Sequence, residues 1–218
     1  MDQSLQAFFR RQDESDDSLF YTVPRKVVHI DDYAIAALTD LYRELLQDGD
    51  TILDLMSSWR SHLPPELRPA RTVGLGMNAE EMAENPQLDE WLLHDLNHEP
   101  ALPFNDGIFD AALCAVSVQY MTRPLETFAE VRRLLKPGGI FAVSFSNRCF
   151  PTKAVSGWLY GGDQQHLGVV QSYFEASAGW RDIHTEDRTP QRERGLQDPL
   201  FAAWAYKVSQ HQAPAKAD

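Results

Sequence analysis

An acidic residue lies in a short apolar run near residue 50, an arrangement that many nucleotide-binding proteins use to hold their ligand. The run is Thr51–Leu55, it contains Asp54, and its apolar residues predict a buried strand. Such proteins usually turn through glycines after this strand, because glycine accepts a positive φ and leaves room for a close ligand. Here the residues that follow are Met56, Ser57, Ser58, Trp59 and Arg60. Two interpretations are open: a cofactor loop built in another way, or a site that has lost its ligand.

Polar residues also follow other apolar runs, where their side chains could bind a ligand or orient a substrate. The run 71–75 leads into Gly76, Met77 and Asn78, and the run 90–94 leads into Asp95. Asn78 is suited to cap a helix that begins at Ala79, and Asp95 could equally be a solvated acid at a strand end. The later runs, 109–116 and 140–145, are followed by Ser117, Gln119 and Tyr120 and by Asn147 and Arg148.

The elements that position these residues alternate between strands and helices along most of the chain. Apolar runs predict strands over 51–55, 71–75, 90–94, 109–116, 140–145, 180–186 and 200–208. Helical spacing predicts helices over 3–11, 31–47, 79–84, 124–135 and within 151–177, with Asp31 or Asp32 as one N-cap. The acidic run 13–17 is expected to be a solvated linker. This order indicates a doubly wound α/β sheet, which binds ligands at the C-terminal ends of its strands.

Bulk properties narrow the class of protein. A chain of 218 residues is expected to form one main domain. The formal net charge of -12 argues against binding the nucleic-acid backbone, which requires clustered Lys and Arg. Cys114 and Cys149 lie far apart, so neither a zinc site nor a disulfide framework is predicted, and we expect no metal. Without an apolar leader or a long apolar run, we expect a soluble, cytoplasmic protein without membrane contact.

Four segments together resemble a known family. They are "DTILDL", "TVGLGMNAEEM", "HDLNHEPALPFNDGIFDAALCAVSVQYM" and "LETFAEVRRLLKPGGIFAVSFSNR", in this order between about residues 50 and 147. In this order and spacing the chain is similar to class I S-adenosylmethionine-dependent methyltransferases of the type 11 kind. The resemblance implies a Rossmann-like seven-stranded sheet in the order 3-2-1-4-5-7-6, with strand 7 antiparallel and helices on both faces. It divides the chain into an N-terminal helical or lid segment (1–48), a methyltransferase-like domain (49–209) and a disordered tail (210–218).

The same resemblance implies S-adenosylmethionine as cofactor, bound over the ends of the first two strands. Asp54 keeps the family's acid, whereas Met56, Ser58 and Arg60 occupy the family's glycine positions. One interpretation is a rebuilt loop, in which the hydroxyls of Ser57 and Ser58 bind the cofactor's carboxylate and the indole of Trp59 covers it. The other is a structural relic with Trp59 in the core.

The remaining cofactor positions also follow from the resemblance. Gly76 stands where the family has a ribose-binding acid, so Asn78 is the substitute candidate, and Met77 could pack on the adenine. Asp95 matches the position whose carboxylate accepts the adenine amine, while the backbone amide of Leu96 meets a ring nitrogen. Val116 and Ser117 would complete the cofactor site.

For the reaction, the resemblance implies methyl transfer to an unidentified acceptor, which we expect to be a small molecule. Gln119, Tyr120 and Asn147 are candidates to orient it, and each could instead have a structural role. In this fold the segment upstream of the first strand commonly covers the cofactor, which would bring Tyr21, Arg25 and His29 to the substrate. His29 is then a candidate general base, although a histidine beside valines is more often a packed residue.

Two alternatives stand beside this prediction. The missing glycines and the missing ribose acid favour a non-catalytic descendant, a binding or interaction protein that kept the sheet and lost the cofactor. A dinucleotide-dependent oxidoreductase fits less well, because no G-x-G-x-x-G phosphate loop follows the first strand.

Overall fold

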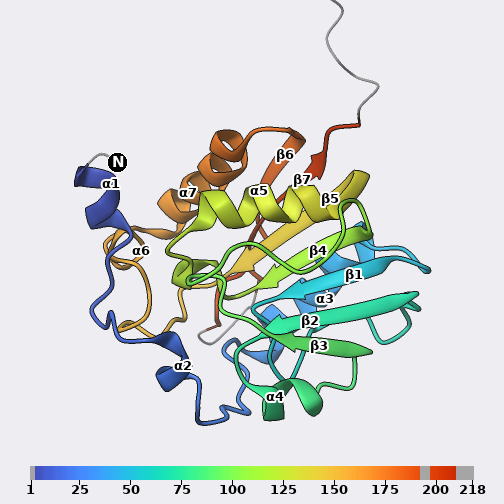
Figure 1. Cartoon of the computed structure of the whole chain (residues 1–218), viewed down its shortest axis with the longest axis horizontal. Helices are drawn as coiled ribbons and strands as arrows, with labels where there is room; N and C mark the ends of the chain where they lie inside the picture. The colour runs from blue at the N-terminus through green and yellow to red at the C-terminus, as the bar shows by residue number, and fades with distance from the viewer. Residues whose placement is uncertain (1–2, 192–196, 210–218) are drawn as a thin grey trace, which may run out of the picture.

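The computed structural model describes residues 3–191 and 197–209, and these residues form a mixed sheet between helices (Figure 1). The strand order is β3-β2-β1-β4-β5-β7-β6. β1 to β5 are parallel, whereas β7 runs antiparallel to both β5 and β6. This order confirms the predicted fold. The described strands are β1 (Thr51–Leu55), β2 (Arg71–Gly76), β3 (Glu90–Leu93), β4 (Phe109–Ala115), β5 (Leu135–Phe145), β6 (Trp180–Asp187) and β7 (Phe201–Lys207).

Local signals explain where the helices begin. The N-cap Asp31 accepts hydrogen bonds from the backbone N–H groups of Tyr33 and Ala34, which starts α3. Asn78 caps α4 in the same way, and Pro124 stands in the first turn of α5, where its missing N–H costs nothing. The described helices are α1 (Gln3–Phe8), α2 (Asp17–Phe20), α3 (Asp32–Leu45), α4 (Ala79–Ala83), α5 (Pro124–Leu134), α6 (Ser156–Leu159) and α7 (Asp163–Ser177), with a 3₁₀ turn η1 (Val118–Tyr120).

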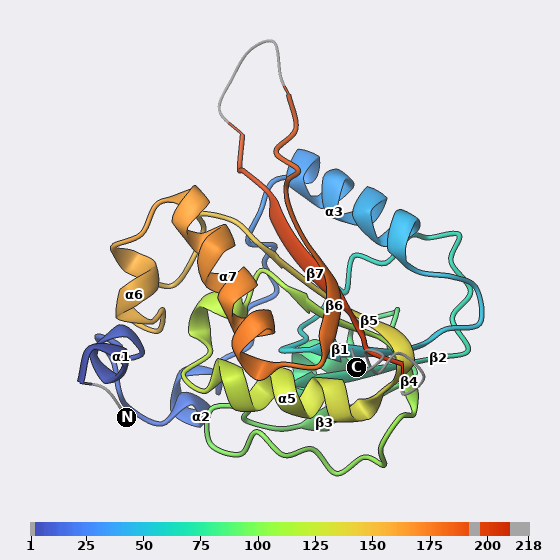
Figure 2. The same cartoon turned by 90° about the horizontal axis from the view of Figure 1, so that it is seen from above.

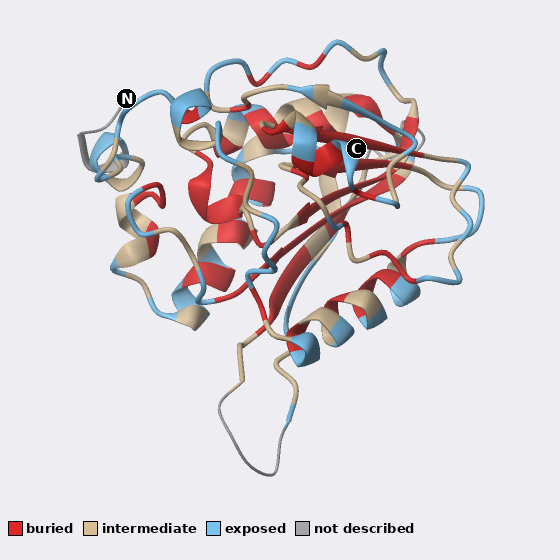
Figure 3. Ribbon diagram, turned by 90° about the horizontal axis from the view of Figure 1, so that it is seen from below, coloured by how far each residue is buried: buried red, intermediate tan, exposed pale blue. Residues whose placement is uncertain are grey.

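Two apolar layers sandwich the sheet. Leu53 and Leu55 of β1 face the layer that contains the buried side of α5 and α7, whereas Ile52 faces the layer under α3. This alternation follows from the two-residue period of a strand and explains why the central strands are almost continuously apolar. Figure 2 shows α3 on one side of the sheet and α5 and α7 on the other. The buried residues lie along the strands and the inner helix faces (Figure 3).

Some element boundaries differ from the prediction. The helical region over 151–177 is two helices, because the chain breaks at Gly161 and Gly162 before α7 begins. β5 starts at Leu135 and not at residue 140: Phe109 pairs with Leu135, and the register with β4 then shifts. Gly138 takes a φ of 82° within this irregular stretch. The predicted domain boundary at residue 48 stays a prediction. α3 lies before this boundary and packs on the sheet that follows it. The predicted tail 210–218 lies outside the described residues.

The acidic run 13–17 is solvated as predicted at Glu14, Ser15 and Asp16, but not at Asp17. The side chain of Asp17 is 4% exposed and accepts hydrogen bonds from Nη1 of Arg11 at 2.8 and 2.9 Å. Nζ of Lys153, whose side chain is 1% exposed, lies 3.1 Å from both Asp17 and Asp13. The prediction was wrong for Asp17, because one of its basic partners, Lys153, comes from a distant part of the chain. Buried charges are paired in this way because an isolated one is costly.

Candidate functional site

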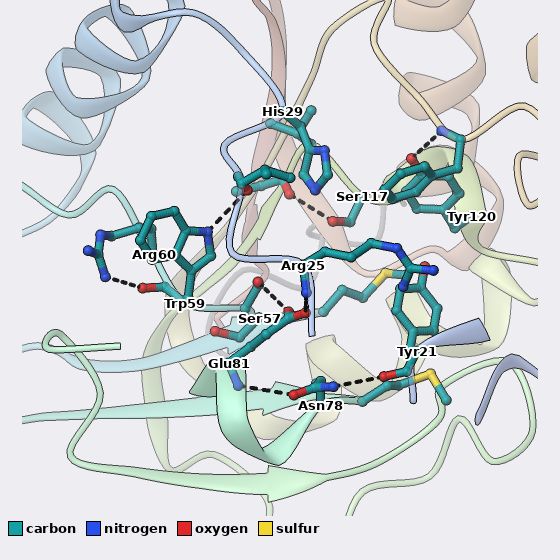
Figure 4. A pocket seen from close by; sticks show the side chains of 18 of the residues that line it. Tyr21, Arg25, His29, Ser57, Trp59, Arg60, Asn78, Glu81, Ser117 and Tyr120 are labelled. Carbon is teal, nitrogen blue, oxygen red and sulfur yellow. Dashed lines mark hydrogen bonds between the residues drawn. The ribbon is translucent and has the colours of Figure 1, made fainter. Parts of the chain in front are cut away.

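A cleft opens at the C-terminal ends of the parallel strands, where doubly wound sheets bind their ligands. It encloses about 1120 Å³ of empty space, part of which is open to solvent. Its walls are the loops after β1, β2, β3 and β4, together with residues of the N-terminal segment 17–30. We call this segment the strap. Figure 4 shows the strap residues Tyr21, Arg25 and His29 facing loop residues of the sheet.

The loop after β1 reaches the cleft by folding onto the end of β2. Met56 has a φ of 53°, the conformation that glycine adopts most easily, so this loop keeps a glycine-like backbone without glycine. The backbone N–H of Ser57 donates to the carbonyl of Leu75 at 2.7 Å. A Cβ placed on Gly76 would lie 2.2 Å from the carbonyl oxygen of Ser57. The space that a ribose-binding acid would need at Gly76 is therefore filled by the loop itself.

Replacing Gly76 by alanine tests this contact. We expect the free energy of unfolding to fall by about 2 kcal/mol, because backbone atoms of Ser57 would have to move. The matched control is Gly74→Ala, whose new Cβ would meet only the end of the flexible, half-buried Leu88 side chain. Urea denaturation of both variants gives the comparison. Equal losses for the two variants would contradict the proposed closeness of the loop.

Asp54 lies under this loop and does not line the cleft. Its carboxylate is 3% exposed and accepts hydrogen bonds from Oγ of Ser57 at 2.7 Å and from Oγ of Ser61 at 2.6 Å. Burial raises the pKa of Asp54 to about 6, although the two serine hydroxyls lower it. Both hydroxyls donate to the same oxygen, Oδ2. In this structure Asp54 therefore holds the loop by its serines and stays behind the cleft wall.

At the end of β2, Asn78 takes the capping role that we had left open. Its Oδ1 accepts the backbone N–H of Glu81 at 3.0 Å, and its Nδ2 donates to the carbonyl of Tyr21 at 2.8 Å. The preceding Met77 lines the cleft, and its packing on an adenine stays a prediction. Ribose binding by Asn78 stays a prediction, and it would compete with the bond to Tyr21.

Glu81 is a cleft residue that sequence reasoning missed. The residue is 7% exposed. Its Oε1 accepts a hydrogen bond from the backbone N–H of Arg25 at 2.5 Å, and its Oε2 accepts one from the hydroxyl of Ser58 at 2.6 Å. An Asn-x-x-Glu spacing indicates only the start of a helix, where a glutamate usually bonds back to the cap. Nothing in that spacing predicts a carboxylate turned toward a segment more than fifty residues earlier.

The wall next to β3 presents free polar groups. Oδ1 of Asp95 accepts the backbone N–H groups of Asn97 at 2.9 Å and of His98 at 3.4 Å. Within the described part of the chain, Oδ2 of Asp95 and the backbone N–H of Leu96 make no hydrogen bond. Both residues line the cleft. The pair thus offers one acceptor and one donor, which is the pattern that an adenine edge would require.

Only some of the predicted substrate-side residues reach the cleft. Val116, with a φ of 50°, Ser117 and Tyr120 line it, and the Tyr120 hydroxyl accepts the backbone N–H of Phe150 at 2.8 Å. Gln119 is fully buried, and its side-chain amide donates to the carbonyl of Val116 at 2.9 Å. This contact matches the structural role that we named as the alternative to orienting the acceptor. Asn147 and Arg148 are exposed and lie outside the cleft wall.

Two neutral imidazoles face the cleft. Burial lowers the pKa of His29, the predicted candidate base. Burial, with Arg60 and His29 nearby, lowers the pKa of His62 to about 4, and this residue has a φ of 58°. His62 was missed because it stands in a polar loop with no pattern around it. Both rings are therefore mostly uncharged at neutral pH, and the low pKa of His62 makes it a weak proton acceptor.

Two further observations concern metal binding and membrane crossing. Among residues 3–191 and 197–209, no group of three or more His, Cys, Asp or Glu side chains is placed to hold a metal ion. In the same residues, none of the helices combines the length and the apolar character that crossing a lipid bilayer requires.

Sequence comparisons with known proteins find methyltransferases over part of the chain. The methyltransferase-domain family matches residues 67–143. The C-methyltransferase UbiE of ubiquinone and menaquinone biosynthesis from Roseobacter denitrificans is 34% identical over 107 residues, which are 49% of this chain and 39% of that protein. The chain matches about two fifths or less of the length of each of three curated relatives.

Solved structures extend the likeness of fold to most of the chain. The putative methyltransferase solved with the Trm112 activator from Haloferax volcanii aligns with a TM-score of 0.62 and 17% identity, over 84% of this chain and 92% of that one. An S-adenosylmethionine-dependent methyltransferase from Mesorhizobium loti aligns with a TM-score of 0.57 and 18% identity, over 78% and 98%. The match over residues 67–143 and the shared fold confirm the predicted resemblance to class I S-adenosylmethionine-dependent methyltransferases of the type 11 kind.

Proposed function

We propose that the chain binds S-adenosylmethionine in this cleft and transfers its methyl group to a small-molecule acceptor. The observation that carries the proposal is the free acceptor and donor pair of Asp95 and Leu96 at the cleft wall. The methyltransferase-domain match and the shared fold support it, and they do not favour the non-catalytic alternative.

The two ends of the cleft differ in how well they suit this cofactor. At the adenine end, Oδ2 of Asp95 would accept the exocyclic amine and the Leu96 N–H would donate to a ring nitrogen. At the ribose and methionine end, the polar side chains of Ser57, Ser58, Trp59 and Asn78 already bond to the chain itself. The adenine end therefore fits the cofactor as it stands, and the other end fits only if some of these bonds exchange.

The residues beside the strap suit the acceptor. When bound, the cofactor supplies a methyl group on a positively charged sulfur, which an acceptor atom displaces in line. The chain's contribution is to align the acceptor, exclude water and take up a proton where the acceptor loses one. His29 is the imidazole at this wall that would take up such a proton, since the low pKa of His62 makes it the poorer candidate. Tyr120 and Phe150 provide the aromatic surface of the wall.

The variant Asp95→Asn tests the proposal most directly. Asparagine keeps an oxygen for the turn to Asn97 but replaces the free Oδ2 by an N–H donor, which would oppose the adenine amine. We expect S-adenosylhomocysteine to raise the melting temperature of the parent protein and to bind Asp95→Asn at least about tenfold more weakly.

Isothermal titration calorimetry gives the affinities. Asp40→Asn, an exposed acid on α3 away from the cleft, serves as the control and should bind like the parent. Absence of binding to the parent protein at millimolar ligand would overturn the proposed function.

A further inference from the structure

The polar groups at the ribose and methionine end of the cleft are bonded to the strap. Nε1 of Trp59 donates to the carbonyl of Val27 at 3.1 Å, and Nδ2 of Asn78 donates to the carbonyl of Tyr21 at 2.8 Å. Oε1 of Glu81 accepts the backbone N–H of Arg25 at 2.5 Å. We call these three side chains the anchors. They come from the loops and the helix that follow β1 and β2, and each one bonds to a backbone atom of the strap (Figure 4).

The strap also places a cationic side chain in the cleft. In Figure 4 the Arg25 side chain extends across the pocket, between Tyr120 and Tyr21 in that view. Its guanidinium lies 4.1 Å from the centre of the Phe20 ring, and Nη1 donates to the Phe20 carbonyl at 2.8 Å. Arg25 is therefore held by the strap's own residues, and it lines the cleft that a ligand would enter.

The aliphatic side chains between the two ends of the strap contribute little to holding it, and its ring contacts with Phe150 are made by Phe20 and His29. Leu19, Val23, Val27 and Val28 have 69%, 66%, 55% and 44% of their surface exposed. The buried residues are at its two ends, Asp17 at 4% and Ile30 at 3%. A segment with fixed ends, hydrogen bonds in the middle and few buried side chains can open locally while the core stays folded.

We propose that residues 21–28 of the strap are an internal competitor for the cofactor, which must leave the anchors before the ribose and methionine end can be filled. This inference rests on the proposed function. Release of the strap frees the indole N–H of Trp59, the amide N–H₂ of Asn78 and one oxygen of Glu81. Two donors suit a carboxylate, and a carboxylate oxygen suits ribose hydroxyls, so the groups that hold the strap match those that the cofactor carries.

Amide hydrogen exchange distinguishes a competitor from a closing lid, because the two predict opposite changes in the exchange rate of the strap when ligand binds. If the strap is displaced, saturating S-adenosylhomocysteine should speed amide exchange in residues 21–28, above all at the Arg25 N–H that Glu81 now accepts. A lid that closes on the ligand would slow exchange in the same residues. Slower or unchanged exchange with ligand bound would overturn the inference and leave the proposed function standing.

The variant Arg25→Ala gives a second, independent sign. It removes the stacked guanidinium from the strap without changing Glu81, Asn78 or Trp59, so S-adenosylhomocysteine should bind about tenfold more tightly. Weaker binding would mean that Arg25 holds the ligand, and unchanged binding that it does not compete; either overturns the inference.

A matched control and a ligand-free measurement complete the experiment. Val23→Ala changes an exposed strap residue outside the cleft wall, and its affinity should stay within about twofold of the parent. Without ligand, Arg25→Ala should already show faster exchange in residues 21–28 than the parent. If neither parent nor variant binds the ligand at millimolar concentration, the proposed function fails and the inference fails with it.

Discussion

Replacing Asp17 by alanine is expected to lower the free energy of unfolding by about 3–5 kcal/mol. The change leaves Arg11 without its carboxylate at a side chain that is 8% exposed, and it removes one of the two acids beside the buried Lys153. Burial raises the pKa of Asp17, but Arg11, Asn97 and Lys153 lower it further, so that the carboxylate stays charged in the folded chain. Urea denaturation at pH 7 gives the free energy of unfolding.

An exposed ion pair provides the control for this prediction. Glu66 pairs with Arg43, and both side chains are about half exposed. Glu66→Ala should therefore cost less than about 1 kcal/mol, because solvent screens the pair and hydrates either charge alone. A loss for Asp17→Ala no larger than that of Glu66→Ala would show that the cluster is hydrated and does not hold the N-terminal segment.

The strands were predictable because their signals are local. The apolar runs around Asp54, at 71–75 and at 109–116 are long enough to mark buried parallel strands, and the structure pairs them in the expected order. An N-cap at Asp31 or Asp32 was predictable for the same reason, and the structure selects Asp31, which accepts the N–H groups of Tyr33 and Ala34. Boundaries failed where pairing overrides local preference, as at Leu135.

The cleft was predictable in position but not in its contacts. The C-terminal strand ends and Asp95 follow from the topology, which the sequence pattern specifies. The hydrogen bonds of Glu81 to Arg25 and of Trp59 to Val27 join segments that are far apart along the chain. No residue spacing reports such an approach, because the partners are brought together only by the folded sheet.

The same limit applies to Asp54, whose predicted binding of the cofactor stays a prediction. A resemblance assigns an acid to a motif position, but it does not report which atoms already satisfy that acid. Here Ser57 and Ser61 supply both hydroxyl donors, and the second serine stands outside the motif. Whether the acid contacts a ligand therefore depends on the loop that covers it.

The difference in unfolding free energy between Asp54→Asn and the parent is expected to change with pH. At neutral pH it should favour the variant by about 3 kcal/mol more than it does at pH 4. Folding raises the pKa of this carboxyl from its ordinary 3.8 to about 6. Between these two values the folded chain keeps a proton that the unfolded chain releases, so the parent protein loses stability as the pH rises. Asparagine carries no such charge, and its side-chain oxygen can still accept the hydroxyls of Ser57 and Ser61.

The pH profile separates this effect from a general change in packing. The difference in unfolding free energy between Asp54→Asn and the parent should grow from pH 4 to pH 6 and stay level above that, as measured by urea denaturation at each pH. Asp110→Asn is the control of opposite sign. Burial raises the pKa of Asp110, but Lys136 and the Thr51 N–H lower it further, so the net shift of its pKa is downward. The ionised form of Asp110 therefore stabilises the fold. This contribution is lost only as the pH falls below the ordinary pKa of an aspartate. A pH-independent difference for Asp54→Asn would mean that Asp54 is solvated in the folded protein and that its oxygens are available to a ligand.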